Sequence, residues 1–369
     1  MRSVFPLVYE CPISLARNFS LLPSLKLCCN HPTLLIVNLK RLARNRRGRM
    51  HKPCEKIERG VTAGLLAKLR KGRMEMEQAL GKWSKRHLAA TVLDPLGVAM
   101  LRHHYHSPVV FPEDIHHPLS EPRQLPGLDL NVEGQLALIH RFNYRDELLE
   151  IPRQKAGDAL FGYENGQFES GDAEMLYNMI RHFKPRQIVE IGGGQSTLMA
   201  LLAERQNQVN DANTCCHHIC IEPNGHHWLD NIGVSVIRRQ IEHLNSDLTS
   251  QLQAGDILFI DSSHVIRPQG DVLHEYLYLL GLLKPGVIVH AHDIFTPRDY
   301  PAEWIIERRY LWNEQYLLEA FLSFNKSFEV LAAVNYLAHE HRSELLRACP
   351  VFAEQPDREP GSFWFRKVH

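Results

Sequence analysis

The sequence predicts an α/β fold with a doubly wound, mainly parallel sheet, and three observations support this prediction. Strand-like and helix-like segments alternate from residue 187 onward. The strand-like segments are continuous apolar runs, which indicates burial on both faces of a sheet. The first of them enters a turn of three consecutive glycines, and a helical run leaves that turn at 198–205. Together these features are typical of βα units between two helix layers.

The predicted elements of the sheet follow in a regular order. A helix is expected first, at 172–182, because the Lys184-Pro185 pair after it is a stop signal. Strands are then expected at 187–191, 217–223, 234–241, 256–263 and 286–294. Between them, helical stretches are expected at 196–206, 226–231, 246–252 and 271–283. The sequence therefore predicts four consecutive βα units followed by a fifth strand.

The C-terminal part adds two more strand-like segments. A long helical pattern at 301–324 precedes strand-like runs at 328–334 and 362–368, with only a short helical stretch, 340–348, between these two. A dinucleotide-binding sheet more often continues with right-handed crossovers. The end of the chain therefore favours a different class of nucleotide-type fold.

The glycine turn indicates the kind of ligand. A dinucleotide site requires G-x-G-x-x-G, and here Gly192 and Gly194 fit while Thr197 holds the third position. Glu190 precedes the first glycine by two residues, and a carboxylate repels a pyrophosphate but attracts an ammonium group. The pattern Glu190-x-Gly192-x-Gly194 resembles motif I of the class I S-adenosylmethionine (SAM) methyltransferases.

The resemblance covers about residues 160–369 and implies a Rossmann-like methyltransferase fold: an α/β sheet of seven strands, mainly parallel, with an antiparallel last strand. It also implies SAM as the cofactor. Glu190 is expected to help hold the ammonium group, and Ser196 or Thr197 to cap the following helix. Glu222, at the end of the second strand, is expected to accept hydrogen bonds from the ribose hydroxyls, as it would also in a dinucleotide enzyme. The expected cofactor-binding residues are thus Glu190, Gly192, Gly193, Gly194, Ser196, Thr197, Glu222, Gln240 near the adenine, and Asp261.

Reaction chemistry is expected where strands four and five end, because a doubly wound sheet places its ligands at the carboxyl ends of its strands. The run Asp261-Ser262-Ser263-His264 resembles a strand-four motif, often Asp-Gly-x-His, of a group that includes sugar O-methyltransferases. Some members hold Mg²⁺ with this Asp and an acidic pair after strand five. Here His292 replaces the first acid of that pair and Asp293 remains.

Two versions of the chemistry follow, because a hydroxyl acceptor must lose its proton as it attacks the methyl group. In one, Asp261 and Asp293 hold Mg²⁺, which lowers the pKa of the hydroxyl. In the other, which we favour, His264 or His292 acts as a base without a metal, because a hard cation prefers oxygen ligands. The expected catalytic residues are Asp261, His264, His292 and Asp293.

The substrate pocket is expected to draw on residues 292–304, a proline-bounded loop of polar and aromatic residues that suits a small polar acceptor such as a sugar hydroxyl. The predicted function is O-methylation of a small molecule or glycan. Two alternatives remain: an NAD-dependent oxidoreductase or epimerase, and a non-catalytic SAM-binding module. The first would need a Tyr-x-x-x-Lys or equivalent constellation, which the sequence lacks, and the acids and histidines at both strand ends argue against the second.

The charge distribution divides the chain into three predicted parts. The net charge is zero, but residues 1–73 hold 16 Lys and Arg against 3 Asp and Glu, which leaves 26 against 39 for the rest. We expect a basic, disordered extension at 1–73, a helical cap at 74–160 and the methyltransferase domain at 161–369. No aromatic residues interleave the basic cluster, so no nucleic-acid partner is expected. The apolar run 34–37 is too short to span a bilayer, and a cytoplasmic location is expected.

Overall fold

The computed structural model describes residues 105–245 and 247–369, which belong to the compact unit formed by His103–His369. The basic extension at 1–73 and residues 74–104 of the expected cap lie outside the described residues. No helix of the described part is both long and apolar enough to cross a membrane. The boundary between cap and sheet domain stays a prediction.

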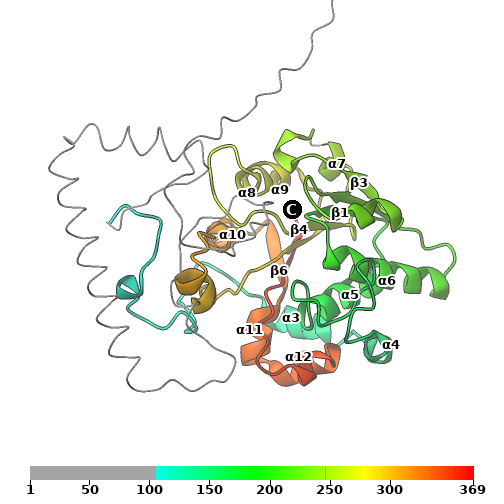
Figure 1. Cartoon of the computed structure of the whole chain (residues 1–369), viewed down its shortest axis with the longest axis horizontal. Coiled ribbons are helices and arrows are strands. Elements are labelled where there is room, and N and C mark those ends of the chain that lie inside the picture. The colour runs from blue at the N-terminus through cyan, green and yellow to red at the C-terminus, as the bar shows by residue number, and fades with distance from the viewer. Residues whose placement is uncertain (1–104, 246) are drawn as a thin grey trace, which may run out of the picture. The chain divides into compact units, whose positions relative to one another are not determined.

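The core of the unit is a sheet of seven strands in the order β3-β2-β1-β4-β5-β7-β6 (Figure 1). Strands β1 to β5 are parallel to one another, and β7 runs antiparallel to both β5 and β6. The predicted fold class, a mainly parallel seven-stranded sheet with an antiparallel last strand, is confirmed. The strands are β1 (Gln187–Ile191), β2 (His217–Ile221), β3 (Ser235–Ile237), β4 (Ile257–Ile260), β5 (Ile288–Ala291), β6 (Phe328–Ala333) and β7 (Phe363–Lys367).

Residues of the central strands β1, β4 and β5 enter two separate apolar cores on the two faces of the sheet, which is why these strands read as continuous apolar runs. Ile188 of β1 joins one core and Val189 joins the other. The first core includes residues of α3 (Val132–Ile139), α4 (Arg145–Glu150), α5 (Asp172–Phe183), α6 (Gln195–Asn210), α11 (Val334–Glu340) and α12 (Arg342–Ala348). The second includes residues of α8 (Asp271–His274), η6 (Glu275–Leu279), α9 (Leu280–Leu282) and α10 (Glu314–Leu322). Figure 1 shows α8 to α10 on the side of the sheet away from α3, α5 and α12.

The remaining helical segments are short turns that connect these elements. They are η3 (Pro112–Asp114), η4 (His227–Asn231), η5 (Ile241–His243), α7 (Asp247–Ser250), η7 (Glu303–Glu307) and η8 (Phe352–Glu354). Part of the expected cap belongs to the same core as the sheet: Leu138 of α3 and Leu148 of α4 are buried there. These two helices therefore stabilise the sheet directly.

The prediction of one long helix at 301–324 is wrong for the middle of this segment. The chain forms η7, leaves helical geometry at 308–313, and resumes with α10. The physical reason is a tertiary contact, since the backbone amides of Asn313 and Glu314 both donate to the carbonyl of His264, at 2.9 and 3.2 Å. Arg309 also adopts a positive φ of 58°. This break brings the residues after η7 to the edge of the sheet where ligands are expected.

Candidate active site

A pocket of about 470 Å³ lies at the carboxyl ends of β1, β2, β4 and β5. Its wall combines the glycine turn with most of the side chains expected at these strand ends. The predicted site residues that line it are Gly192, Gly193, Gly194, Ser196, Glu222, Asp261, His292 and Asp293. Parallel strands bring these residues together although they are spread along a hundred residues of sequence.

The glycine turn is required by the packing of three strands. Gly192 has φ 84° and donates its amide to the carbonyl of Ile221 at 3.0 Å. A Cβ at this position would collide with the carbonyl oxygen of Asp261. At Gly194, by contrast, the nearest atom to a Cβ would be Nε2 of His226, at 3.9 Å. Glycine therefore allows close packing at the start of the turn and leaves space for a ligand at its end.

Glu190 is placed differently from the expectation. It is buried, and its Oε1 accepts the hydroxyl of Ser196 while its Oε2 accepts that of Thr197, both at 2.6 Å. Neither Glu190 nor Thr197 belongs to the pocket wall. Neither Ser196 nor Thr197 is the N-cap of α6, which is Gly194, but the hydroxyl of Thr197 accepts the amide of Gly194 at 3.0 Å. Glu190 therefore ties the glycine turn to the first turn of α6, and the structure does not bring its carboxylate to the pocket.

His218 completes this buried network, and the sequence analysis missed it. Its Nε2 lies 3.0 Å from Oε2 of Glu190, and its Nδ1 lies 2.8 Å from Oε1 of Glu204 on α6. Burial opposes a charge on this imidazole, but Glu204 and Glu190 outweigh it and raise its pKa to about 10. A histidine inside an otherwise apolar strand was the available signal.

We expect the His218 imidazolium to stabilise the fold in a pH-dependent way. Its folded pKa of about 10 lies above the ordinary 6.5, so its contribution is complete below 6.5 and is lost as the pH rises through 10. His218→Gln should lower the free energy of unfolding by about 3 kcal/mol near pH 6, because the buried Glu190 and the half-buried Glu204 lose their cation. Urea denaturation at a series of pH values measures this difference, which should shrink toward pH 10.

His217→Gln provides the matched control, since His217 is the exposed neighbour on the same strand. It should leave stability nearly unchanged at every pH. A deficit of His218→Gln that is constant across the pH range would contradict the charged state assigned to His218.

The end of β2 brings one expected residue and one unexpected residue to the pocket. Glu222 lines the pocket, and its Oε1 accepts the amide of Asn224 at 2.8 Å. Gln240 is exposed just before η5 and is not part of the wall, so the structure does not support its expected position near an adenine. His226 lines the pocket instead and stacks on Trp228, with ring centroids 5.1 Å apart. An aromatic pair shortly after the second strand was the signal that could have found it.

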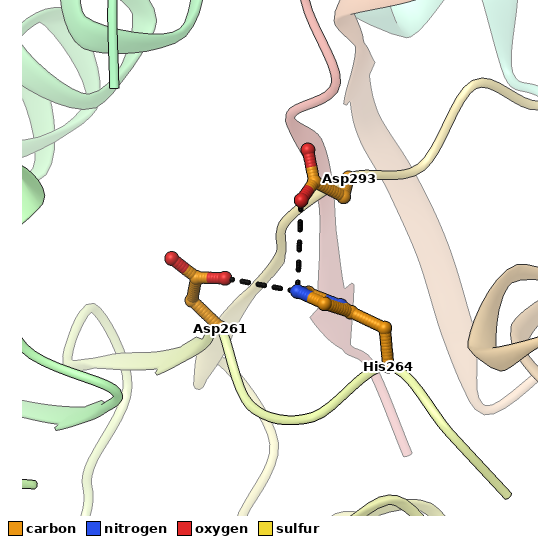
Figure 2. A group of neighbouring side chains, drawn as sticks. All are labelled: Asp261, His264 and Asp293. Carbon is orange, nitrogen blue, oxygen red and sulfur yellow. Dashed lines mark ion pairs between the residues drawn. The ribbon is translucent and has the colours of Figure 1, made fainter. Parts of the chain in front are cut away.

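Asp261, His264 and Asp293 converge at the ends of β4 and β5, as Figure 2 shows. Nε2 of His264 lies 3.2 Å from Oδ1 of Asp261 and 3.6 Å from Oδ2 of Asp293. His264 and Asp293 both have positive φ values, 59° and 57°, which are uncommon for side chains of this size and cluster at functional sites. The convergence predicted from the two strand ends is thus present.

The other nitrogen of His264 is held by a fully buried carboxylate. Its Nδ1 lies 2.8 Å from Oε2 of Glu314, whose Oε1 accepts the hydroxyl of Tyr276 at 2.7 Å. Burial opposes protonation of His264, but hydrogen bonds to Asp261 and Glu314 outweigh it and raise its pKa well above 6.5. The imidazole is therefore held as a cation among three carboxylates.

The two carboxylates beside His264, Asp261 and Asp293, differ from each other in proton affinity. Burial raises the pKa of Asp293. Burial acts in the same direction on Asp261, but His292 and His264 outweigh it and lower the pKa of Asp261. His292 is itself buried, and Asp293 and Asp261 outweigh that burial and raise its pKa. Of these groups, Asp261 is thus the one best stabilised in its ionised form.

The same three side chains have the arrangement of a cation site. Asp261, His264 and Asp293 each offer one ligand atom, and these atoms lie within 4.8 Å of one another. Nδ1 of His264 faces Glu314, which leaves Nε2 as the ligand atom, an outer-shell arrangement common in metal sites. The two carboxylates suit Mg²⁺, whereas the imidazole suits a softer divalent ion. The donor set therefore fits a divalent cation without selecting Mg²⁺.

Acidic groups outnumber basic groups in the pocket wall. Asp172, Glu222, Asp261, Asp293 and Glu359 line it together with two arginines and two histidines, His226 and His292. Each arginine is already paired: Arg308 lies 2.7 Å from Glu303, and Arg358 lies 3.0 Å from Glu169. The pocket therefore attracts a cationic ligand and repels an anionic one.

Comparisons with known proteins agree with this geometry. Residues 189–294 match a family model described as a methyltransferase domain. An uncharacterized protein from Archaeoglobus fulgidus is 35% identical over 77 residues, which are 20% of this chain and 35% of that protein. The chain thus covers about a third of the length of this relative.

Solved structures give only a distant likeness. An O-methyltransferase from Bacillus cereus in complex with SAH is 13% identical, with 63% of this chain and 91% of that chain covered and a TM-score of 0.28. A TM-score this low supports no conclusion about the present chain. The match to the family model is therefore the finding that bears on the resemblance seen in the sequence.

Proposed function

We propose that this chain, whose residues 189–294 match a methyltransferase domain, is a class I SAM-dependent methyltransferase that transfers the methyl group of SAM to a hydroxyl of a small molecule or glycan. The observation that carries this proposal is the acid-rich pocket in which the glycine turn meets Asp261 and Asp293. SAM carries an ammonium and a sulfonium charge, and both are favoured beside these carboxylates.

The residues present fit SAM. The space beside Gly194 allows a ligand to approach the main chain. Glu222 lines the same pocket and suits a ribose diol, because a carboxylate accepts two hydrogen bonds. His226 also lines this pocket, with its Nε2 the nearest atom to the position of a Cβ at Gly194, and it offers an aromatic face. We assign the cofactor to this wall, with Asp172 or Asp261 rather than Glu190 as the acid nearest its ammonium group.

An NAD-dependent enzyme is the less favoured alternative. A dinucleotide would place a diphosphate beside Asp261 and Asp293, where no unpaired arginine lines the described wall to neutralise it. The sequence also lacks a Tyr-x-x-x-Lys pair. Charge therefore favours SAM over NAD in this pocket.

The chain's own part in catalysis is to hold the acceptor and remove its proton. The bound cofactor would supply an electrophilic methyl group. Asp261 is the base that we favour, because it is ionised while His264 and His292 both tend to be protonated. His264, fixed by Glu314, orients Asp261 through the contact at its Nε2. A divalent cation held by Asp261, His264 and Asp293 would be the alternative way to lower the pKa of the acceptor hydroxyl.

Titration calorimetry with S-adenosylhomocysteine (SAH) and with NAD tests the cofactor. We expect the full chain to bind SAH with a dissociation constant of about 1 µM and to show no heat with NAD. Glu222→Ala should weaken SAH binding by about tenfold or more, because it removes hydrogen bonds to a charged acceptor. Glu133→Ala is the matched control, since Glu133 is exposed on α3 and outside the pocket wall. Binding of NAD without SAH would overturn the proposed function.

A further inference from the structure

A second hollow adjoins the candidate active site. Its volume is about 750 Å³, and Tyr310 and Trp312 line both this hollow and the pocket at the glycine turn described above. The ring of Trp312 lies 4.3 Å from the ring of His264, measured between centroids. A molecule in this hollow would therefore be separated from the catalytic cluster only by this aromatic wall.

The shared wall is fixed in place by ring packing. Tyr310 and Trp312 stack with centroids 4.7 Å apart, and Trp304 packs edge-on against Trp312 at 5.0 Å. The next residue, Asn313, accepts the amide of Ile266 and donates its own amide to the carbonyl of His264. The segment that lines the second hollow is thus the segment that holds His264.

Most of the surface of the remaining lining is apolar, and polar side chains such as His116, Glu121 and Gln124 contribute the smaller part. It comes from two parts of the chain, residues 108–124 and 299–316. Val109, Ile115, Leu119, Ile305 and Leu311 all contribute to it. The volume falls within the range of about 300–1,000 Å³ that is usual for sites of drug-sized ligands.

The arginines of this lining are already engaged. Arg123 lies 3.0 Å from Asp299, and it also donates to Glu319 at 2.8 Å. Tyr316 donates its hydroxyl to Asp299 at 3.0 Å. Arg309 donates to the carbonyl of Val110. Among the described residues of this lining, no arginine is therefore left unpaired for an anionic ligand.

We propose that the second hollow binds the body of the methyl acceptor, and that this body is an uncharged, apolar ring system bearing the hydroxyl. The inference rests on the proposed function and specifies its substrate class. Aromatic walls suit flat ring systems, because stacking adds to the burial of apolar surface. The reactive hydroxyl would pass Trp312 to reach Asp261, while the ring system stays beside Ile305 and Tyr316.

A free sugar fits this hollow poorly. The hydroxyls on the side of the sugar that faces Val109, Ile115 and Ile305 would have no partner there, and each polar group buried without a partner costs about 1–3 kcal/mol. The loop at 292–304 led us to expect a small polar acceptor, and we now propose an acceptor with an apolar body instead. A glycan would be accepted only as a substituent of such a body.

Calorimetric titration of the full chain, saturated with SAH, tests the inference with three probes: 2-naphthol, 2-naphthoate and methyl glucoside. We expect 2-naphthol to bind, and the anion and the glucoside to bind about tenfold more weakly or not at all. Ile305→Trp, which fills the hollow, should weaken 2-naphthol binding by about tenfold or more and leave SAH affinity unchanged.

Two further variants make the test decisive. Leu277→Trp is the matched control, because Leu277 is 68% exposed and lines neither hollow. Ile115→Asp introduces a charge from the other part of the lining and decides the matter if Ile305→Trp does not fold. The inference is overturned if SAH binds but 2-naphthol does not, if the glucoside binds as well as 2-naphthol, or if the folded lining variants bind 2-naphthol normally. Failure of SAH binding would instead overturn the proposed function.

Discussion

Gly192→Ala is expected to abolish SAH binding and to lower Tm by about 10 °C, because its Cβ would overlap a backbone atom. The atom is the carbonyl oxygen of Asp261, which belongs to the neighbouring strand end and cannot rotate away. The φ of 84° adds a cost of about 1–2 kcal/mol for any residue with a side chain. Calorimetric titration with SAH and thermal denaturation of the full chain measure the two effects.

Gly233→Ala is the control that has the cost of a positive φ without a collision of the Cβ. Gly233 also has a positive φ, 99°, but no atom lies within 4 Å of the position that its Cβ would take. This variant should lose only about 1–2 kcal/mol of stability and keep its SAH affinity. If both variants bind SAH equally well, the close approach of β1 and β4 at Gly192 has no part in shaping the pocket.

Asp261→Asn is expected to lower kcat by about 100-fold or more while the protein stays folded, because the amide cannot accept the proton of the acceptor hydroxyl. Loss of this carboxylate also removes one of the three that surround the His264 imidazolium. SAH release, measured with a panel of naphthols and glycosides as acceptors, reports kcat. Asp247→Asn is the matched control and should retain full activity, because Asp247 is exposed at the start of α7.

Chelation decides between the two versions of proton removal at Asp261. Activity that survives a chelator favours Asp261 as the base, whereas activity that is lost and then restored by a divalent ion favours a metal held with His264 and Asp293. Full activity in Asp261→Asn would contradict both versions.

The local signals in the sequence were sufficient for the sheet. A continuous apolar run such as Ile257–Ile260 marks a strand buried on both faces, and the glycine turn marks the end of β1. The meeting of Asp261 with Asp293 was also predictable, since β4 and β5 are parallel neighbours and their carboxyl ends share one edge. The long helix at 301–324 failed because its interruption depends on backbone contacts with His264, which no local pattern encodes.

By itself, then, the sequence determined where the strands lie along the chain and where the glycine turn lies, because both depend on local apolar patterns. It also determined the edge of the sheet at which the acids gather, because that depends on the direction of the strands. Only the tertiary structure decided how each acid is used. The register of β1 against β2 places Glu190 and His218 on the same face, where α6 adds Glu204. Glu314 reaches His264 from α10, and the second hollow joins residues 108–124 to 299–316. Burial and partners from distant segments set the pKa and the role of a side chain, and neither is written in the residues next to it.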